Sequence, residues 1–240
     1  MAVVEVFPRA PIVEAILSLE LNYLDDLPAL ADKYWQAIGN ELPSRERTGG
    51  PAAALRPSGR LQSTSTEYRF GSEDGLHVVQ VSRRAFSFHR MRPYQDWAQF
   101  SATARHFWEA FVEHFGPERI SEIHLRYLNR IEIPLPLDYL QDYLALYPMV
   151  PEEIDTGSIG YLMRLSLSDP AVPALAHVTQ RFEYDPERRV FPIVFDIDVS
   201  RSGDWAVTDR ELWQSIEGLR DYKNRLFFES ITERTRALFR

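Results

Sequence analysis

The stretch IHLRYLNRIEI, residues 123–133, alternates apolar with polar or charged side chains over nearly its whole length. Because successive side chains of a strand point to opposite faces of its sheet, this pattern predicts a strand with one apolar and one charged face. The apolar face carries Ile123, Leu125, Tyr127, Asn129, Ile131 and Ile133, and the charged face carries His124, Arg126, Leu128, Arg130 and Glu132. A sheet face that no helix covers can present such charged groups to a ligand.

On the N-terminal side of this strand, apolar spacing of three and four residues predicts helices at residues 27–38 and 96–115. The second helix carries a stripe of aromatic residues, which we expect in the core, and it should end at Gly116-Pro117. Residues rich in strand formers predict strands at 11–21, 60–70 and 76–82, a turn at Arg83-Arg84, and a further strand through Phe86 and Phe88. Residues 43–58 are expected to form a loop or a short edge strand.

On the C-terminal side, a short helix is expected at residues 136–146 and a loop at 148–158. Strands are then predicted at 159–168, 176–184 and 190–199, with turns at Asp169-Pro170 and Asp185-Pro186. A long terminal helix should follow over residues 208–239, with Thr208 as its N-cap.

Both halves of the chain thus have the expected order strand, helix, three strands, helix. The prediction is an α+β fold, with a curved antiparallel sheet built from two β-α-β-β-β-α structural repeats and backed by two long helices. The repeats would be residues 1–118 and 119–240, which share the sheet as one unit. The alternative is a single irregular sheet without internal symmetry.

Composition excludes several classes of protein. The chain has no cysteine, so disulfide scaffolds, thiolate metal sites and cysteine nucleophiles are excluded. A net charge of -8 disfavours nucleic acid as a partner. No signal peptide or bilayer-spanning apolar run is present, so we expect a cytoplasmic protein without a membrane partner. Lysine occurs only at positions 33 and 223, so nearly all of the basic residues are arginine.

Three segments together resemble a known family. They are PIVEA at residues 11–15, LRYLNRIEIP at 125–134 and FFESITERTRALF at 227–239, and VSRRAFSFHR at 81–90 is similar to the family's middle segment. The family is a sporadically distributed group of uncharacterised prokaryotic proteins, and the resemblance covers nearly the whole chain. It implies no established reaction, and the patchy distribution suggests an accessory component of a mobile-element or defence locus.

The charged strand face is the candidate ligand site, and its alternative interpretation is a solvated outer surface. Arginine side chains suit phosphate or carboxylate groups. Asp196 and Asp198 are two residues apart on a predicted strand, where such carboxylates can bind a divalent cation, although more often they face solvent. We expect no resident metal and no cofactor. The candidate ligand-binding residues are His124, Arg126, Arg130, Arg164, Asp196 and Asp198.

The usual nucleotide-binding, hydrolase and kinase signatures are absent from the sequence. The first hypothesis is therefore a non-enzymatic binding or interaction protein. The alternative is an enzyme or binder that acts on a phosphorylated or nucleotide-like small molecule through the arginine and aspartate residues of the sheet, so whether the protein is an enzyme stays open. Glu14 and Asn129, polar residues inside apolar strands, are expected to be hydrogen-bonded within the fold.

We expect a homodimer, because an open sheet leaves two edges and one uncovered face. Residues 43–59 and the terminal helix are its expected contributors. The alternative is a monomer that buries its aromatic residues internally. Other expected partners are a protein or an anionic small molecule.

Overall fold

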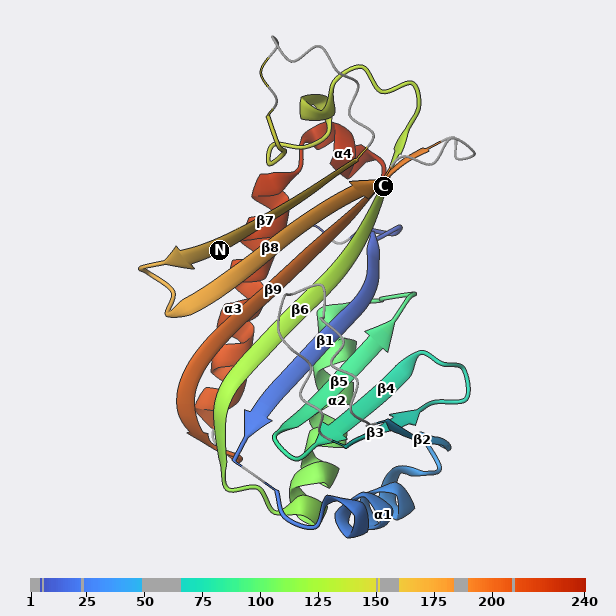
Figure 1. The fold of residues 1–240 in the computed structure, drawn as a ribbon, viewed down its shortest axis with the longest axis vertical. Helices are drawn as coiled ribbons and strands as arrows, with labels where there is room; N and C mark the ends of the chain where they lie inside the picture. Colours follow the sequence, from blue (N-terminus) through green and yellow to red (C-terminus); the bar gives the residue numbers. More distant parts are fainter. Residues whose placement is uncertain are drawn as a thin grey trace.

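The computed structural model describes residues 5, 7–22, 24–48, 66–149, 151, 160–183, 190–208 and 210–240, and nine strands within them form one antiparallel sheet (Figure 1). The strands are β1 (Ile12–Leu21), β2 (Ser44–Thr48), β3 (Glu67–Gly71), β4 (His77–Ser82), β5 (Ala85–Met91), β6 (Arg119–Pro134), β7 (Gly160–Asp169), β8 (Ala174–Glu183) and β9 (Val190–Ala206). Their order across the sheet is β2-β3-β4-β5-β1-β6-β9-β8-β7. Strands from both halves of the chain therefore join in one α+β architecture.

The register places the apolar residues of the central strands on one face. Leu17 of β1 pairs with Phe88 of β5 on one side and with Leu125 of β6 on the other, and Leu125 in turn pairs with Val199 of β9. Directly paired residues lie on the same face of a sheet, so these four side chains form a continuous apolar row. All of them are fully buried.

Two long helices cover this apolar face, α2 (Trp97–Phe115) and α3 (Arg210–Ser230) (Figure 1). Phe100 of α2 lies 6.1 Å from the ring of Tyr127 on β6, measured between ring centroids, and the amine of Lys223 on α3 lies 3.6 Å from the same ring centroid. Both helices therefore lie on the same side of the sheet, as the sequence predicts. The short helix α1 (Leu27–Ile38) packs against α2, where the hydroxyl of Tyr34 donates to the carbonyl oxygen of Phe107 at 2.9 Å.

Local signals in the sequence set the ends of α2 and the turn between β3 and β4. The Asp96 side chain accepts a hydrogen bond from the backbone N–H of Gln99, and Gly116 ends the helix with φ of 57°, a left-handed conformation that glycine adopts without strain. In the hairpin turn, Gly75 has φ of 69° for the same reason. The predicted end of α2 at Gly116 is confirmed.

The prediction of a helix at residues 136–146 is wrong, because only a short 3-10 turn, η1 (Leu140–Asp142), forms there. The segment hydrogen-bonds instead to the end of the chain. The N–H of Ala145 donates to the carbonyl of Ser230 at 2.9 Å, and the carbonyl of Tyr143 accepts from the N–H of Thr232 at 2.9 Å. Tertiary hydrogen bonds thus replace those of a local helix.

The same contacts correct a second prediction, that of one continuous terminal helix over residues 208–239. Helix α3 ends at Ser230, and a separate short helix α4 (Glu233–Ala237) follows. Between them Ile231 forms a bridge with Leu144, and the Thr232 N–H donates to Tyr143 rather than continuing the helix. The expected N-cap Thr208 borders residue 209, which lies outside the described residues. Residues 49–65, 152–159 and 184–189 also lie outside them, so the structure does not test the predictions made for these segments.

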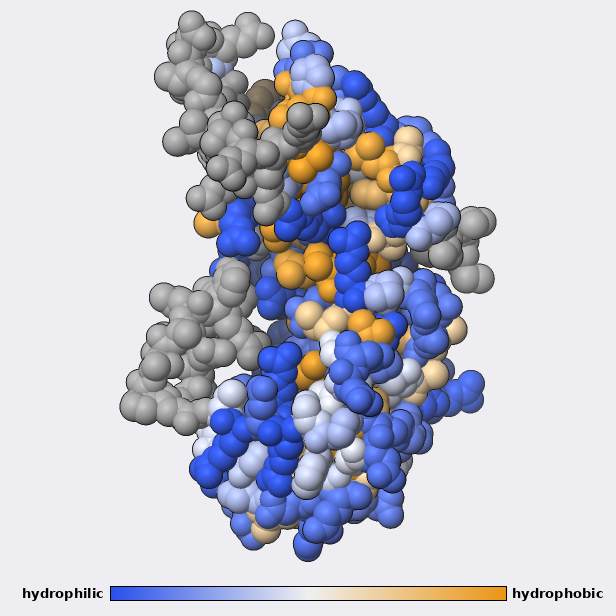
Figure 2. Space-filling model, turned by 90° about the vertical axis from the view of Figure 1, so that its right-hand side faces the viewer, coloured by the Kyte–Doolittle hydropathy of each residue, from blue (hydrophilic) through white to orange (hydrophobic). Residues whose placement is uncertain are grey.

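The two ends of the molecule differ in the character of their surfaces. The exposed large hydrophobic residues of the described chain belong to β7, β8 and the segment after β6; they are Leu135, Tyr139, Met149, Leu162 and Leu175. Seen from the side, hydrophobic residues gather in the upper and middle parts of the molecule, and the lower part is mainly hydrophilic (Figure 2). No described helix is both long and apolar enough to span a bilayer.

Candidate functional site

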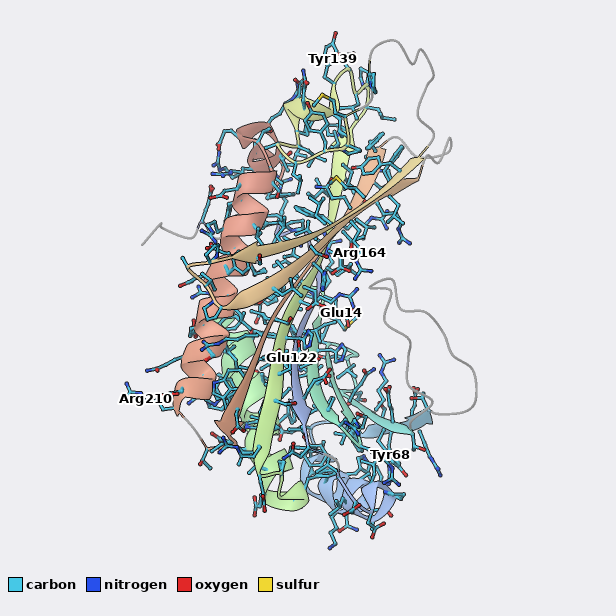
Figure 3. All side chains as sticks on the ribbon, turned by 60° about the vertical axis from the view of Figure 1, so that its left-hand side comes forward. Glu14, Tyr68, Glu122, Tyr139, Arg164 and Arg210 are labelled. Carbon is cyan, nitrogen blue, oxygen red and sulfur yellow. The ribbon has the colours of Figure 1, made fainter. Side chains whose placement is uncertain are left out.

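The charged residues that the sequence singles out lie on the face of the sheet opposite α2 and α3. In Figure 3, Glu14 and Arg164 point away from these helices. Arg126 on β6 pairs directly with Asp198 on β9, and its side chain reaches diagonally to Asp196. His124, Arg126, Asp196 and Asp198 are therefore brought together at the centre of this face.

Arg126 makes a two-pronged contact with Asp196. Its Nε donates to Oδ1 at 2.8 Å and its Nη2 donates to Oδ2 at 2.6 Å. Asp196 is only 7% exposed, and its hydrogen bonds to Arg126 raise the pKa of the guanidinium further. The fork that would grip a phosphate is thus already occupied by a carboxylate of the protein.

His124 lies among three carboxylates from three strands. Its Nδ1 lies 3.3 Å from Asp198 Oδ1, and its Nε2 lies 3.4 Å from Glu122 and 3.9 Å from Glu20. Burial is the largest single influence and opposes the charge, but the hydrogen bonds and charges of Asp198 and Glu122 outweigh it and raise the pKa of His124 to about 9. The side chain is therefore an imidazolium at neutral pH.

The oxygen and nitrogen atoms of Glu20, Glu122 and His124 lie within 4.8 Å of one another, a spacing that suits a metal ion. A protonated histidine must lose its proton before it can bind a metal, so the raised pKa of His124 opposes metal binding at neutral pH. The negative groups around the ring likewise disfavour an anion.

The remaining polar residues of this face form separate pairs. Glu14 bonds to His89, with Oε1 and Nδ1 2.8 Å apart, and this hydrogen bond lowers the pKa of the carboxyl. Arg130 bonds to Glu132 at 2.9 Å. Arg164 is exposed on β7, two strands away from β9. Four of the six candidate residues, His124, Arg126, Asp196 and Asp198, thus pair with one another, and Arg130 and Arg164 lie apart from them.

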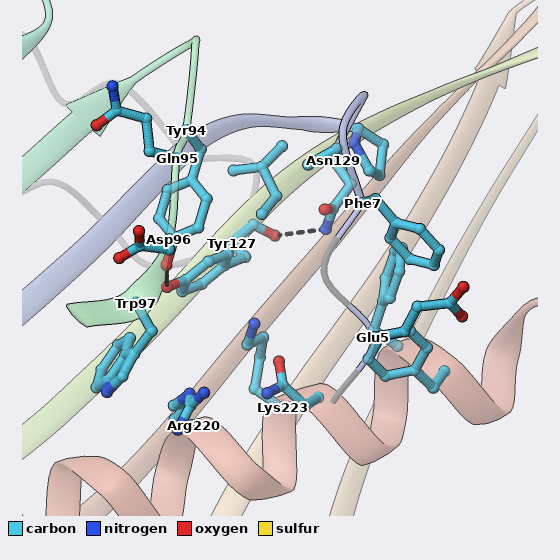
Figure 4. A pocket seen from close by; sticks show the side chains of 16 residues that line it. Glu5, Phe7, Tyr94, Gln95, Asp96, Trp97, Tyr127, Asn129, Arg220 and Lys223 are labelled. Atoms are coloured by element: carbon cyan, nitrogen blue, oxygen red, sulfur yellow. Dashed lines mark hydrogen bonds between the residues drawn. The ribbon is translucent and has the colours of Figure 1, made fainter. Parts of the chain in front are cut away.

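A cavity of about 110 Å³ lies on the other face, between the central strands, the start of α2 and the middle of α3 (Figure 4). We call it the interhelical pocket. Aromatic side chains make up much of its wall, and polar groups reach it from α3 and β6. The lining residues that matter for its chemistry are Phe7, Tyr94, Trp97, Tyr127, Asn129, Arg220, Lys223 and Phe227.

Lys223 is the most unusual residue of the interhelical pocket. It is only 8% exposed, and its Nζ lies 3.6 Å from the centroid of the Tyr127 ring. No carboxylate of the described chain forms an ion pair with it. Burial, together with the positive charge of Arg220, lowers the pKa of Lys223 to about 7.

Other hydrogen-bonding groups line the same pocket. The hydroxyls of Tyr94 and Tyr127 bond to each other at 2.9 Å, which uses one of their two protons and leaves the other for a molecule in the pocket. Asn129 donates from Nδ2 to the carbonyls of Tyr127 at 3.3 Å and Phe195 at 3.1 Å. Its Oδ1 accepts no hydrogen bond from the described residues. The pocket therefore offers both a donor and an acceptor.

Arg220 stands beside Trp97 at the edge of the interhelical pocket. Its guanidinium carbon lies 5.3 Å from the Trp97 ring centroid, and its Nη1 lies 3.4 Å from a carboxylate oxygen of Glu217. Glu217 also accepts a shorter hydrogen bond, 2.7 Å, from the Trp97 indole N–H. Arg220 is thus held loosely by its carboxylate and keeps donors for a ligand.

The fold and the pocket together define an α+β protein with an aromatic cavity between its sheet and two helices, and the lining of this cavity includes the basic residues Arg220 and Lys223 and the acidic residues Glu5 and Asp96. A scan against protein-family models and a search of the curated proteins both find no match to this chain.

The sequence analysis missed Lys223, although a signal for it exists. Along α3 the apolar stripe follows helical spacing, and Lys223 occupies a position within it; the stripe is Leu212, Ile216, Leu219, Lys223 and Phe227. A lysine in such a position is buried against the sheet unless it snorkels to the surface. Because the chain has only two lysines, a lysine inside this apolar stripe is the sequence signal that could have indicated the pocket.

Proposed function

We propose that this protein binds a small organic anion in the interhelical pocket. The observation that carries the proposal is the buried amine of Lys223, which has no carboxylate partner in the described chain. Burying an unpaired cation costs several kcal/mol, and the ring of Tyr127 returns only about 2 kcal/mol of this. A bound anion supplies the missing countercharge.

The cavity volume limits the size of the ligand. A cavity of about 150 Å³ holds one benzene molecule, and the interhelical pocket measures about 110 Å³. The pocket is smaller than that cavity, so a short branched chain or at most one ring fills it, with the charged group directed towards Arg220 and Lys223. A nucleotide is too large.

The charged sheet face supports the alternative, binding of a phosphorylated or nucleotide-like molecule, less well. Arg126 is engaged by Asp196, and His124 is surrounded by carboxylates. A phosphate would have to displace these contacts. We therefore propose a binding protein whose ligand site lies on the opposite face of the sheet, in the interhelical pocket.

Thermal shift and calorimetry with benzoate, 3-methylbutanoate and the neutral analogue benzamide test the proposal. A ligand at about 100 times its Kd stabilises the native state by about 2.7 kcal/mol. We expect both carboxylates, but not benzamide, to raise the Tm of the wild type and of Lys33→Met, a control that removes the exposed lysine of α1. Equal binding of benzamide, or undiminished carboxylate binding by Lys223→Met, would overturn it.

We further propose that the two halves of the chain are structural repeats. Outward from the central β1 and β6, the order is β5-β4-β3 on one side and β9-β8-β7 on the other, and α2 and α3 follow β5 and β9 in the chain. The helix α1 and the edge strand β2 have no counterpart among the described residues of the second half. Superposing residues 12–115 on 119–230 in an experimental structure tests this, because a repeat requires these strands to match in that order.

A further inference from the structure

We propose that the ligand of the interhelical pocket is a small 2-oxo acid, and that Lys223 captures its carbonyl carbon as an imine. This inference rests on the proposed function, because it needs an organic anion in the pocket. It adds a covalent step and names the class of ligand.

The geometry of the pocket favours reaction at this amine. Figure 4 shows Lys223 extending from α3 towards Tyr127, and the side chain is only 8% exposed. No carboxylate of the described chain forms an ion pair that would stabilise the protonated amine. The cation–π contact of the amine is with the Tyr127 ring. An imine-forming lysine is activated by a desolvated setting or by a neighbouring cation, and Lys223 has both, with Arg220 as the cation.

The protonation of Lys223 agrees with this role. Attack on a carbonyl requires the neutral amine, and an ordinary lysine with a pKa of about 10.4 is neutral in roughly one molecule in 2,500 at pH 7. Burial, aided by the charge of Arg220, lowers the pKa of Lys223 to about 7. About half of the molecules then carry a neutral amine, which is about 1,000 times the fraction at an exposed lysine.

The position of Arg220 selects a ligand with adjacent charge and carbonyl. Arg220 and Lys223 are three residues apart on α3 and both line the pocket. Such residues share one face of the helix, with Cβ atoms about 5–6 Å apart. A carboxylate bound by Arg220 therefore places a neighbouring carbonyl within reach of Lys223, as in a 2-oxo acid.

The reaction balances without an oxidant or a reductant. The Nζ lone pair forms a bond to the carbonyl carbon, the carbonyl π pair moves to oxygen, and one proton passes from nitrogen to that oxygen to give a carbinolamine. The C–O bond then breaks, the oxygen leaves as water with the second amine proton, and the nitrogen lone pair forms the C=N bond.

The Tyr94 and Tyr127 hydroxyls supply and recover the proton that assists loss of water. Burial raises the pKa of Tyr94 to about 12 and that of Tyr127 well above its ordinary value, so both are protonated at neutral pH. Their mutual hydrogen bond lets a proton move between them while one hydroxyl faces the ligand.

The chain contains its own control for a trapping experiment, because its only other lysine is Lys33, which is exposed on α1. The full-length protein is incubated with 3-methyl-2-oxobutanoate and sodium cyanoborohydride, which reduces an imine to a stable secondary amine. Peptide mass spectrometry then locates the adduct. The same treatment is applied to Lys223→Met, which keeps the side-chain volume without the amine, and to Lys33→Arg.

Among the lysines we expect one adduct, on Lys223, that forms at least about 100-fold faster than any adduct on Lys33, given the difference in neutral amine. The N-terminal α-amine, with an ordinary pKa of about 7.7–8.0, is also labelled and is assigned separately by its peptide. The rate at Lys223 should reach half its maximum near pH 7, and Lys33→Arg should behave as the wild type. Equal labelling of both lysines, or an undiminished yield of lysine adduct in Lys223→Met, overturns the inference.

The 2-hydroxy analogue, 2-hydroxy-3-methylbutanoate, separates this inference from the proposed function. It has the same charge and nearly the same shape but no carbonyl. If it raises the Tm while the 2-oxo acid leaves no trapped adduct, the imine is refuted and anion binding stands. If neither compound binds, both proposals fail.

Discussion

Replacing His124 by glutamine should remove a pH-dependent part of the stability of the fold. The imidazolium faces Glu20 on β1, Glu122 on its own strand and Asp198 on β9, with Arg126 beside them. Glutamine keeps a polar side chain of similar size but cannot carry the charge. The variant therefore isolates the contribution of the positive charge to the free energy of unfolding.

The magnitude follows from the two pKa values. The pKa of His124 rises from its ordinary 6.5 to about 9 in the folded protein. At about 1.4 kcal/mol for each tenfold change in the equilibrium constant, the difference corresponds to about 3 kcal/mol. Because the folded pKa is the higher one, this stability is fully present below pH 6.5 and is lost as the pH rises through about 9. Asp198, whose pKa is lowered, stays ionised throughout this range.

Urea denaturation of wild type and His124→Gln at pH values from about 6 to 10 measures the effect. The difference in free energy of unfolding should be about 3 kcal/mol larger at the acid end than at the alkaline end. Comparing two proteins at each pH cancels other titrating groups, above all Lys223. The matched control is His106→Gln, because His106 pairs with Glu41 while the side chains are 56% and 53% exposed. A difference that stays constant with pH would refute the reasoning.

Four other predictions concern stability and assembly. Arg126→Ala should lower the free energy of unfolding by about 2–4 kcal/mol because it leaves Asp196 unpaired, whereas Arg130→Ala should cost at most about 1 kcal/mol; equal costs in urea denaturation would contradict this. Asn129→Ala should cost about 1–3 kcal/mol through its lost bonds to buried carbonyls, and an unchanged Tm would place that residue outside the scaffold. Without ligand, Lys223→Met should stabilise the protein by about 1–4 kcal/mol below pH 7, with the gain shrinking as the pH rises towards 10.5 and the wild-type amine becomes neutral; a loss of stability at pH 6 would argue against a buried, unpaired amine. Light scattering at micromolar concentration should give twice the chain mass of 27.9 kDa for the expected homodimer, and a single-chain mass that is constant on dilution would exclude it.

Much of the fold is determined by the sequence on a local scale. Alternation in residues 123–133 predicts both β6 and its two faces, because the two-residue period of a strand is a property of the backbone. Asp96 and Gly116 mark the ends of α2, because capping involves only residues within one helical turn. Such features need no knowledge of the rest of the chain.

The tertiary structure alone decided where the chain departs from these patterns. Residues 136–146 hydrogen-bond to Ser230 and Thr232 rather than forming a helix, and those partners lie more than 80 residues further along the chain. The same bonds divide the terminal helix at Ile231. A local sequence pattern cannot show that a distant segment will take these hydrogen bonds. Bonds within a helix and bonds to a distant segment satisfy the same backbone groups.

The candidate site shows the same division. Alternation placed His124, Arg126, Asp196 and Asp198 on one face, but only the register of β6 against β9 showed that they satisfy one another. The apolar stripe along α3 places Lys223 at an inward position. The sequence alone does not show that the Tyr127 ring lies over its amine or that a cavity lies beside it. Pairing and cavities depend on which surfaces meet in space, and this is decided by packing between elements that lie far apart in the chain.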